Sequence, residues 1–340
     1  MPILCPLCGT SAPDDAVFCE QDGTRLRESP PGAATLLAAP VLLAAPLPSC
    51  RCGAGAASNV DGYCDACGRK WVQPRKALPR DHIERALSLG FAGVTDRGQR
   101  HSKNEDDFAI SLTDAGDAVL VVCDGVSSSE EADRASAIAS KTMTERLGEP
   151  TTDAANAFRI AVAAANRAVS ALHSSAPGAT SAPPETTVVA AVVRNRDATI
   201  GWVGDSRAYW IDAADPEAAR LLTHDHSWLN DVVDSGEMTR EEAGNNRLAH
   251  AITRCLGASD DPESGEPTVT AFVFPDTAGY LLLCSDGLWN YSETPQKIAE
   301  LVRDAPQNEG AVGIARSLVD WANAQGGRDN ITVTLLAVSA

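Results

Sequence analysis

Two aspartates, each preceded by an apolar run and followed by glycine, are the residues of this sequence best suited to chemistry. Asp124 follows residues 119–123, and Asp286 follows the run 280–284 and one serine. Both runs are short and apolar, and the first is rich in β-branched side chains, which predicts buried strands rather than helices. A carboxylate at the end of a buried strand is costly unless it is paired or binds a cation. The alternative is two ordinary turns, since Asp-Gly is a common turn pair.

Further acidic side chains stand where predicted strands begin or end. Asp205 separates two predicted strands, Asp329 precedes the last one, and Glu105 and Asp106 lie in a polar segment between the first two. Hard divalent cations such as Mg²⁺ and Mn²⁺ take carboxylate and carbonyl oxygens together with water. We therefore expect a shared cation site at these strand ends.

Seven of the ten cysteines precede residue 68, in spacings typical of zinc sites. Residues 50–68 hold two cysteine pairs, each followed by glycine, which predicts a zinc ribbon with a structural rather than a catalytic ion. Residues 5–23 hold three cysteines, with an aspartate where a fourth would stand. The expected zinc ligands are Cys5, Cys8, Cys19, Asp22, Cys50, Cys52, Cys64 and Cys67.

The cysteines also bear on the compartment. No signal peptide precedes the first of them, so we expect a reducing, cytoplasmic environment and metal binding rather than disulfides. Residues 33–47 are apolar, but two prolines interrupt them, and the run is shorter than the roughly 20 residues of a spanning helix. We read residues 29–48 as a Pro/Ala/Leu linker, with a membrane-surface contact as the alternative.

The net charge of −18 is unevenly distributed. Residues 1–80 carry a net charge of +1, whereas residues 81–340 carry −19. So acidic a domain repels the phosphate backbone, which argues against nucleic acid as a partner.

The order of predicted elements indicates the fold class. Strands come in consecutive runs, such as 186–194, 198–204 and 207–212, and pairs of helices separate the runs. This order favours an α+β fold in which two packed antiparallel sheets are covered by helices, rather than a parallel alternating fold. We expect zinc ribbons in 1–72, a joint at 73–86 and the main domain at 87–340.

Residues 87–340 resemble the metal-dependent, type 2C Ser/Thr protein phosphatases, and in particular their bacterial branch. The resemblance rests on eight motifs in the family's order: NED at 104–106, VVCDG at 121–125, TTVVAAVV at 186–193, VGDSRAYW at 203–210, THDHS at 223–227, ITRCLG at 252–257, LCSDGLW at 283–289 and GRDNITV at 327–333. It implies an α-β-β-α sandwich with two Mn²⁺ or Mg²⁺ ions at one end of the sheets. Residues 1–72 resemble the double zinc ribbons of bacterial regulatory proteins.

The resemblance also implies a role for each acidic residue. The two ions would be held by Asp124 bridging both, by Glu105 and the Gly125 carbonyl on one side, and by Asp286 and Asp329 on the other. Asp106 would order coordinated water. Two such ions lower the pKa of a bridging water and stabilise charge on the transferring phosphoryl group, so no covalent phospho-enzyme is needed.

The sequence departs from the family's pattern at several places, among them Ser127-Ser128 in place of paired glycines and Glu185 in place of the glycine before the paired threonines. Where the family has a phosphate-binding arginine stands His101, with Arg100 beside it, and either could contact phosphate. Val126 offers no acid to protonate the leaving group. A third metal site would use Asp205 and a second aspartate, but the second position is Asn290, so a third ion is expected to bind weakly at most.

These features predict hydrolysis of phosphoserine and phosphothreonine in proteins, with zinc ribbons that bind a partner or regulate access. By family analogy the counterparts are a Ser/Thr kinase and its substrates. The alternative is a pseudophosphatase, a module that binds phosphoproteins with little turnover. The departures from the family pattern motivate that alternative, whereas the four core carboxylates oppose it.

Overall fold

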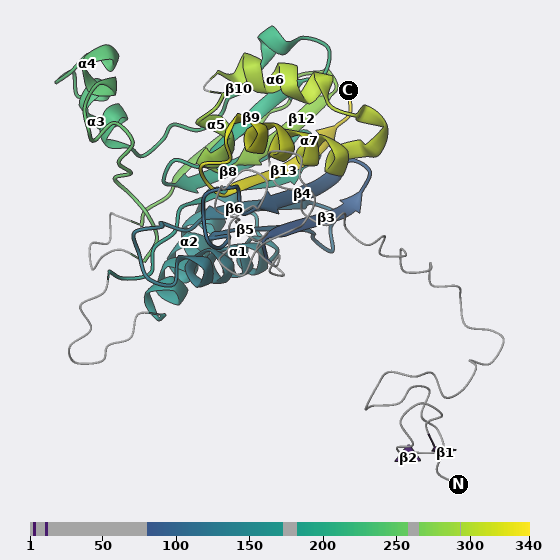
Figure 1. The fold of residues 1–340 in the computed structure, drawn as a ribbon. Coiled ribbons are helices and arrows are strands. Elements are labelled where there is room, and N and C mark those ends of the chain that lie inside the picture. Colours follow the sequence, from purple (N-terminus) through teal and green to yellow (C-terminus); the bar gives the residue numbers. More distant parts are fainter. Residues whose placement is uncertain (1–2, 5–10, 13–79, 173–181, 258–264, 293) are drawn as a thin grey trace, which may run out of the picture. The chain divides into compact units, whose positions relative to one another are not determined.

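The computed structural model describes residues 3–4, 11–12, 80–172, 182–257, 265–292 and 294–340 (Figure 1). The chain divides into two compact units, Met1–Arg75 and Lys76–Ala340. In the first unit, strands β1 (Ile3–Leu4) and β2 (Ser11–Ala12) pair antiparallel. All of the expected zinc ligands lie outside the described residues, namely Cys5, Cys8, Cys19, Asp22, Cys50, Cys52, Cys64 and Cys67.

Two antiparallel sheets form the centre of the second unit, which confirms the predicted antiparallel α+β fold. The five-stranded sheet has the order β11 (Thr268–Val273), β8 (Asp197–Val203), β7 (Val188–Arg194), β6 (Ala118–Asp124) and β5 (Asp106–Leu112). The six-stranded sheet has the order β10 (Arg220–Leu221), β9 (Arg207–Asp212), β12 (Gly279–Cys284), β13 (Ile331–Val338), β4 (Phe91–Asp96) and β3 (His82–Ser88).

Helices cover the outer face of each sheet (Figure 1). The five-stranded sheet is covered by α1 (Ala132–Leu147) and α2 (Ala154–Ser170), and the six-stranded sheet by α6 (Pro295–Asp304) and α7 (Gly310–Gln325). The short helices are α3 (Trp228–Asp234), α4 (Arg240–Gly244) and α5 (Asp286–Trp289), with 3₁₀ turns at Pro216–Ala218 and Gln307–Glu309.

The central strands are apolar throughout because both of their faces are buried. In β6, Leu120 and Val122 point into the core between the sheets, whereas Val119 and Val121 pack against α1 and α2. In β12, Leu281 likewise faces the other sheet. This two-sided burial accounts for the unbroken apolar runs that precede the two Asp-Gly pairs.

Strand β3 begins within residues 73–86, which we expected to be a joint. It pairs with β4 at the edge of the six-stranded sheet, with an irregular register between Ala86 and Ser88. Most of its side chains are exposed, so its sequence lacks the apolar alternation that marks a half-buried strand.

Residues 222–252 form an excursion that contains α3 and α4 and stands off from the sheets in Figure 1. The Ser227 and Thr239 side chains cap the N-termini of α3 and α4. The excursion closes where Trp228 N donates to Ala251 O over 2.9 Å and Ser227 pairs with Ile252. In the described part of the chain, no helix is long and apolar enough to cross a bilayer.

Candidate active site

Four of the predicted acidic residues meet because the strands that carry them end at the same edge. Asp106 is the first residue of β5 and lies opposite Asp124, the last residue of β6. Asp286 follows the end of β12, and Asp329 precedes β13, the antiparallel neighbour of β12. Two carboxylates therefore come from each sheet.

Asp106 joins the two sheets through a single carboxylate oxygen. Its Oδ2 atom accepts hydrogen bonds from Ser285 Oγ over 2.8 Å, directly after β12, and from Thr332 Oγ1 over 2.6 Å, in β13. Thr332 has one hydroxyl hydrogen, so when it donates to Asp106 it accepts from Thr95, 2.7 Å away. Thr95 in turn accepts from the Asn104 amide over 2.9 Å. The direction of each hydrogen bond is thus fixed by the carboxylate.

Burial and mutual repulsion disfavour the charged form of these carboxyl groups. Desolvation, followed by the charges of neighbouring aspartates, raises the pKa of Asp124 well above its usual value. Burial also raises the pKa of Asp106 to about 7, although the hydroxyls of Thr332 and Ser285 partly oppose it. For Asp286, burial and the charge of Asp329 raise the pKa to about 6. No lysine or arginine of the described chain forms an ion pair with Asp106, Asp124 or Asp286.

Two oxygens of this cluster have no hydrogen-bond partner. Asp106 Oδ1 and Asp286 Oδ1 are both fully buried, and a bound cation or its water would satisfy them. Within the described residues, no three acidic, histidine or cysteine side chains already surround one point as the ligands of a single ion would. A hydrated Mg²⁺ keeps several waters and needs only one or two carboxylates. The donor set therefore fits hydrated divalent cations.

Glu105 is buried beside His101, whose other ring nitrogen faces Asp329. Its carboxylate accepts a 2.6 Å hydrogen bond from Ser127 Oγ and lies 3.3 Å from Lys103 Nζ. His101 lies between two of the predicted ligands, with Nε2 3.2 Å from Asp329 Oδ1 and Nδ1 3.8 Å from Glu105 Oε2. Arg100 is exposed, and its guanidinium forms no hydrogen bond or ion pair with the part of the chain that the structure describes. The structure thus brings His101, and not Arg100, to the acid cluster.

Glycines allow the close approach of backbone that the cluster needs. A Cβ atom at Gly125 would lie 2.6 Å from Glu105 O, and one at Gly287 would overlap the Asn330 carbonyl. The first contact places Glu105 beside the Asp124 turn, and the second places Asp286 beside Asp329. Only glycine can follow the aspartate in either pair without displacing its neighbour.

The sequence analysis missed Asn330, which organises the polar segment between β4 and β5. Its buried side chain accepts from Glu105 N over 2.7 Å and donates to Arg97 O over 2.7 Å and Lys103 O over 3.2 Å. The signal was an asparagine next to Asp329, directly before an apolar strand. Its partners lie more than 220 residues away in the sequence, and no local pattern identifies them.

Asp205 lies beside Asp286 in a pocket of about 480 Å³ that Asn290 also lines. Burial and the charge of Asp286 raise its pKa well above the usual value. The Asn290 amide donates to Asp286 Oδ2 over 2.9 Å, in the place of the expected second aspartate. The Arg207 guanidinium stacks on the Trp289 ring at 3.6 Å, and Trp289 Nε1 donates to Asp205 O. These contacts hold the motif at 203–210 against the motif at 283–289.

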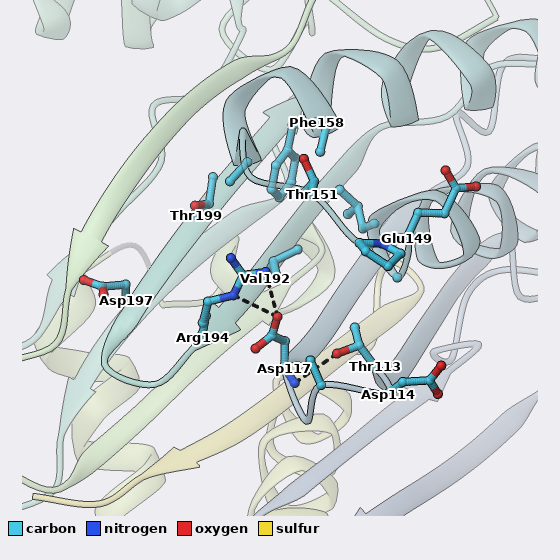
Figure 2. A pocket seen from close by; sticks show the side chains of 16 residues that line it. Thr113, Asp114, Asp117, Glu149, Thr151, Phe158, Val192, Arg194, Asp197 and Thr199 are labelled. Carbon is cyan, nitrogen blue, oxygen red and sulfur yellow. Dashed lines mark hydrogen bonds and ion pairs between the residues drawn. The ribbon is translucent and has the colours of Figure 1, made fainter.

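A second pocket of about 520 Å³ is lined by Asp329 of the cluster and also by Asn290 and His250. A third, of about 380 Å³, lies at the opposite end of the five-stranded sheet, beside the loop from β5 to β6 (Figure 2). Figure 2 shows Arg194 bonded to Asp117 in that pocket. None of the predicted site residues lines it.

The protein phosphatase 2C family matches residues 95–323, which is more than half of the chain. The chain belongs to this family. The prediction that it is an enzyme, a protein phosphatase of the serine/threonine-specific type 2C, is confirmed.

Known members of the protein phosphatase 2C family resemble most of the chain. The serine/threonine phosphatase stp of Listeria monocytogenes is 29% identical over 248 residues, which are 71% of this chain and 93% of that protein. The structure of Stp1 from Staphylococcus aureus matches with a TM-score of 0.63 and 28% identity, over 76% of this chain and 98% of that one. The PstP catalytic domain, solved in complex with two manganese ions, matches with a TM-score of 0.58 and 27% identity, over 76% of this chain and 100% of that one.

Proposed function

We propose that this chain hydrolyses phosphoserine and phosphothreonine in proteins with the help of two Mn²⁺ or Mg²⁺ ions. The observation that carries the proposal is the pair of buried, unpartnered oxygens on Asp106 and Asp286, at the joined ends of two sheets in a type 2C chain. Burying a carboxylate without a counter-charge is costly, and a bound cation would offset that cost.

We assign each acidic residue of the site a role in metal or water binding. The residues that would hold the ions are Asp124, Glu105, Asp286 and Asp329, together with the Gly125 carbonyl. When bound, the ions would lower the pKa of water and offset negative charge on the phosphoryl group. Asp106 holds water through its free oxygen, and its bonds to Ser285 and Thr332 keep that oxygen in place.

We infer that His101, rather than Arg100, contacts the phosphate. Its imidazole lies at the edge of the acid cluster, beside Asp329. It forms a weaker, pH-dependent contact than the two parallel hydrogen bonds of an arginine. We further propose that Asp205 contributes to a third, weaker ion site.

The alternative proposal, a phosphoprotein-binding pseudophosphatase, is favoured by one contact. Ser127 donates a 2.6 Å hydrogen bond to Glu105, one of the proposed ligands, and so competes with a metal for it. This chain would then recognise phosphoproteins with little turnover.

The wider setting is also a proposal. Phosphorylated proteins, including a Ser/Thr kinase and its substrates, would be the partners, in the cytoplasm. The cysteines of residues 1–72 would hold one or two structural Zn²⁺ ions and would bind a partner or regulate access.

Hydrolysis of p-nitrophenyl phosphate and of a phosphothreonine peptide tests the function, with Mn²⁺ or with EDTA. We expect Mn²⁺-dependent turnover that falls at least about 1,000-fold in Asp124→Asn, because charge stabilisation by the ions carries most of the catalysis. Asp114→Asn, an exposed residue at the opposite end of the sheet, is the matched control and keeps full activity. A folded wild type that binds the phosphopeptide without turnover supports the pseudophosphatase instead.

A further inference from the structure

Cleavage of a seryl or threonyl phosphate leaves an alkoxide, which needs a proton as the P–O bond breaks. Val126, the residue after the Asp124-Gly125 turn, is apolar and cannot supply one. The proposed function assigns Glu105, Asp124, Asp286 and Asp329 to the ions and Asp106 to their water. The proton therefore comes from water or from another residue of this chain.

His250 stands at the junction of the two pockets that adjoin the acid cluster. It lines the first pocket together with Asp205 and Asp286, and the second together with Asp329. Asn290 is the other residue that lines both pockets. His250 is exposed and therefore lines the space beside the cluster that a bound substrate would enter.

The backbone holds His250 in this place. The next residue, Ala251, accepts a hydrogen bond from Trp228 N over 2.9 Å, and Ile252 pairs with Ser227. The preceding residue, Ala249, is buried and donates to Asn246 O over 3.0 Å. The imidazole is thus carried by a tethered segment rather than by a free loop.

Among the histidines that the structure describes, His250 alone has a ring with no hydrogen bond or ion pair. The other four are engaged: His82 with Glu84 and Asp96, His101 with Asp329, His224 with Asp234, and His226 with Thr268. The acidic groups that line its two pockets are Asp205, Asp286 and Asp329. The other charged groups there are the ion pair of Arg207 with Asp225, and the side chains of Arg240 and Arg328. An imidazole with both nitrogens free beside the cluster can donate a proton to a substrate and take it back from water.

We propose that His250 protonates the leaving oxygen of the phosphoserine or phosphothreonine substrate. This step rests on the proposed function. Water adds its oxygen to phosphorus and gives up a proton, the bond from phosphorus to the ester oxygen breaks, and that oxygen takes the Nε2 or Nδ1 proton of the imidazolium. Solvent then reprotonates the imidazole. The sum is one phosphate monoester and one water converted to an alcohol and inorganic phosphate.

Leaving-group dependence tests the proposal. p-Nitrophenolate is a weak base that leaves without a proton, whereas a threonine alkoxide is a strong base. In His250→Gln, kcat for the phosphothreonine peptide falls about 100-fold, the lower end of what general acids contribute, while kcat for p-nitrophenyl phosphate changes less than about threefold. Across aryl phosphates, log kcat depends more steeply on the pKa of the leaving phenol than in wild type.

His224→Gln is the matched control. His224 is an exposed histidine of the same excursion that pairs with Asp234 and lines neither pocket, and its replacement leaves both rates unchanged. Equal losses on both substrates in His250→Gln, or no loss on either, overturn the proposal. Wild-type turnover that needs Mn²⁺ keeps these outcomes separate from a failure of the phosphatase function itself.

Discussion

Nε2 of His101 lies 3.2 Å from Oδ1 of Asp329, one of the proposed metal ligands. A histidine offers a single donor on that side, whereas a guanidinium offers two in parallel. The substitution His101→Arg is therefore expected to improve phosphate binding.

For His101→Arg we expect KM for the phosphothreonine peptide and the inhibition constant of inorganic phosphate to fall about tenfold, measured by steady-state kinetics. Arg100→Ala is the control and leaves both constants within about twofold, because Arg100 is exposed and away from the cluster. A rise in KM for Arg100→Ala, with no change for His101→Arg, would show that Arg100 is the phosphate contact.

The raised pKa values predict how the metal-free protein responds to pH. Burial raises the pKa of Asp106 to about 7, against about 3.9 in an unfolded chain. Between these values the folded state holds more protons than the unfolded state, so the stability of the protein falls as pH rises. His226 acts in the opposite direction, since burial lowers its pKa to about 4. The contribution of Asp106 must therefore be measured as a difference.

Asp106→Asn isolates that contribution because an amide still accepts from Ser285 and Thr332. In EDTA at pH 7.5 we expect the variant to melt about 5 °C above wild type, and the gap to close toward pH 5 as Asp106 becomes protonated. Mn²⁺ should raise the melting temperature of wild type more than that of the variant. A gap that does not change with pH, measured by differential scanning fluorimetry, would contradict the assignment.

Asn290→Asp should strengthen a third ion site. Asn290 donates to Asp286 and shares a pocket with Asp205, so an aspartate there adds a carboxylate to two others. We expect one additional Mn²⁺ per chain by calorimetry, at an affinity at least about tenfold above wild type. Asn245→Asp, an exposed change in the same excursion, is the control. Unchanged stoichiometry would argue that Asp205 is not a ligand.

The zinc prediction can be separated from catalysis by truncation. The cut should be made after Arg75, where the second compact unit begins, because Arg80 donates to Asp106 O over 3.2 Å and Asp133 O over 3.0 Å. We expect removal of 1–75 to abolish zinc in elemental analysis. If the first unit only recruits partners, turnover of p-nitrophenyl phosphate stays within about twofold, whereas a large rise would mean that it inhibits.

A truncation after residue 80 serves as the comparison. It also removes Arg80 and is expected to lower thermal stability and turnover relative to the first truncation. Equal behaviour of the two truncated chains would show that the Arg80 contacts are dispensable.

The sequence predicted the parts of the fold whose strands are buried on both faces. β6 and β12 each stand out as an apolar run because helices cover one side and the other sheet covers the second. β3 did not, since an exposed edge strand has neither an apolar run nor alternation. Motif order located the acidic residues, but each acid by itself reads as a turn residue.

The positioning contacts of the site were beyond prediction from the sequence. The two hydroxyls that hold Asp106 lie 179 and 226 residues away from it, and both read as ordinary strand residues. His250 likewise reads as a surface residue of an excursion. Its relation to the cluster depends on how residues 249–252 pair back to the start of α3.

Strand β13 lies between β12 and β4 although it follows every other element in the chain. On the ribosome, β4 therefore emerges long before the strand that joins it to β12, and the nascent chain carries two unpaired sheet edges until residue 338 is free. Such edges invite pairing with other chains, so chaperone cover during translation should matter for the yield of this protein. Asp329 enters the tunnel just ahead of β13, so the acid cluster cannot be completed before that residue has emerged from the ribosome.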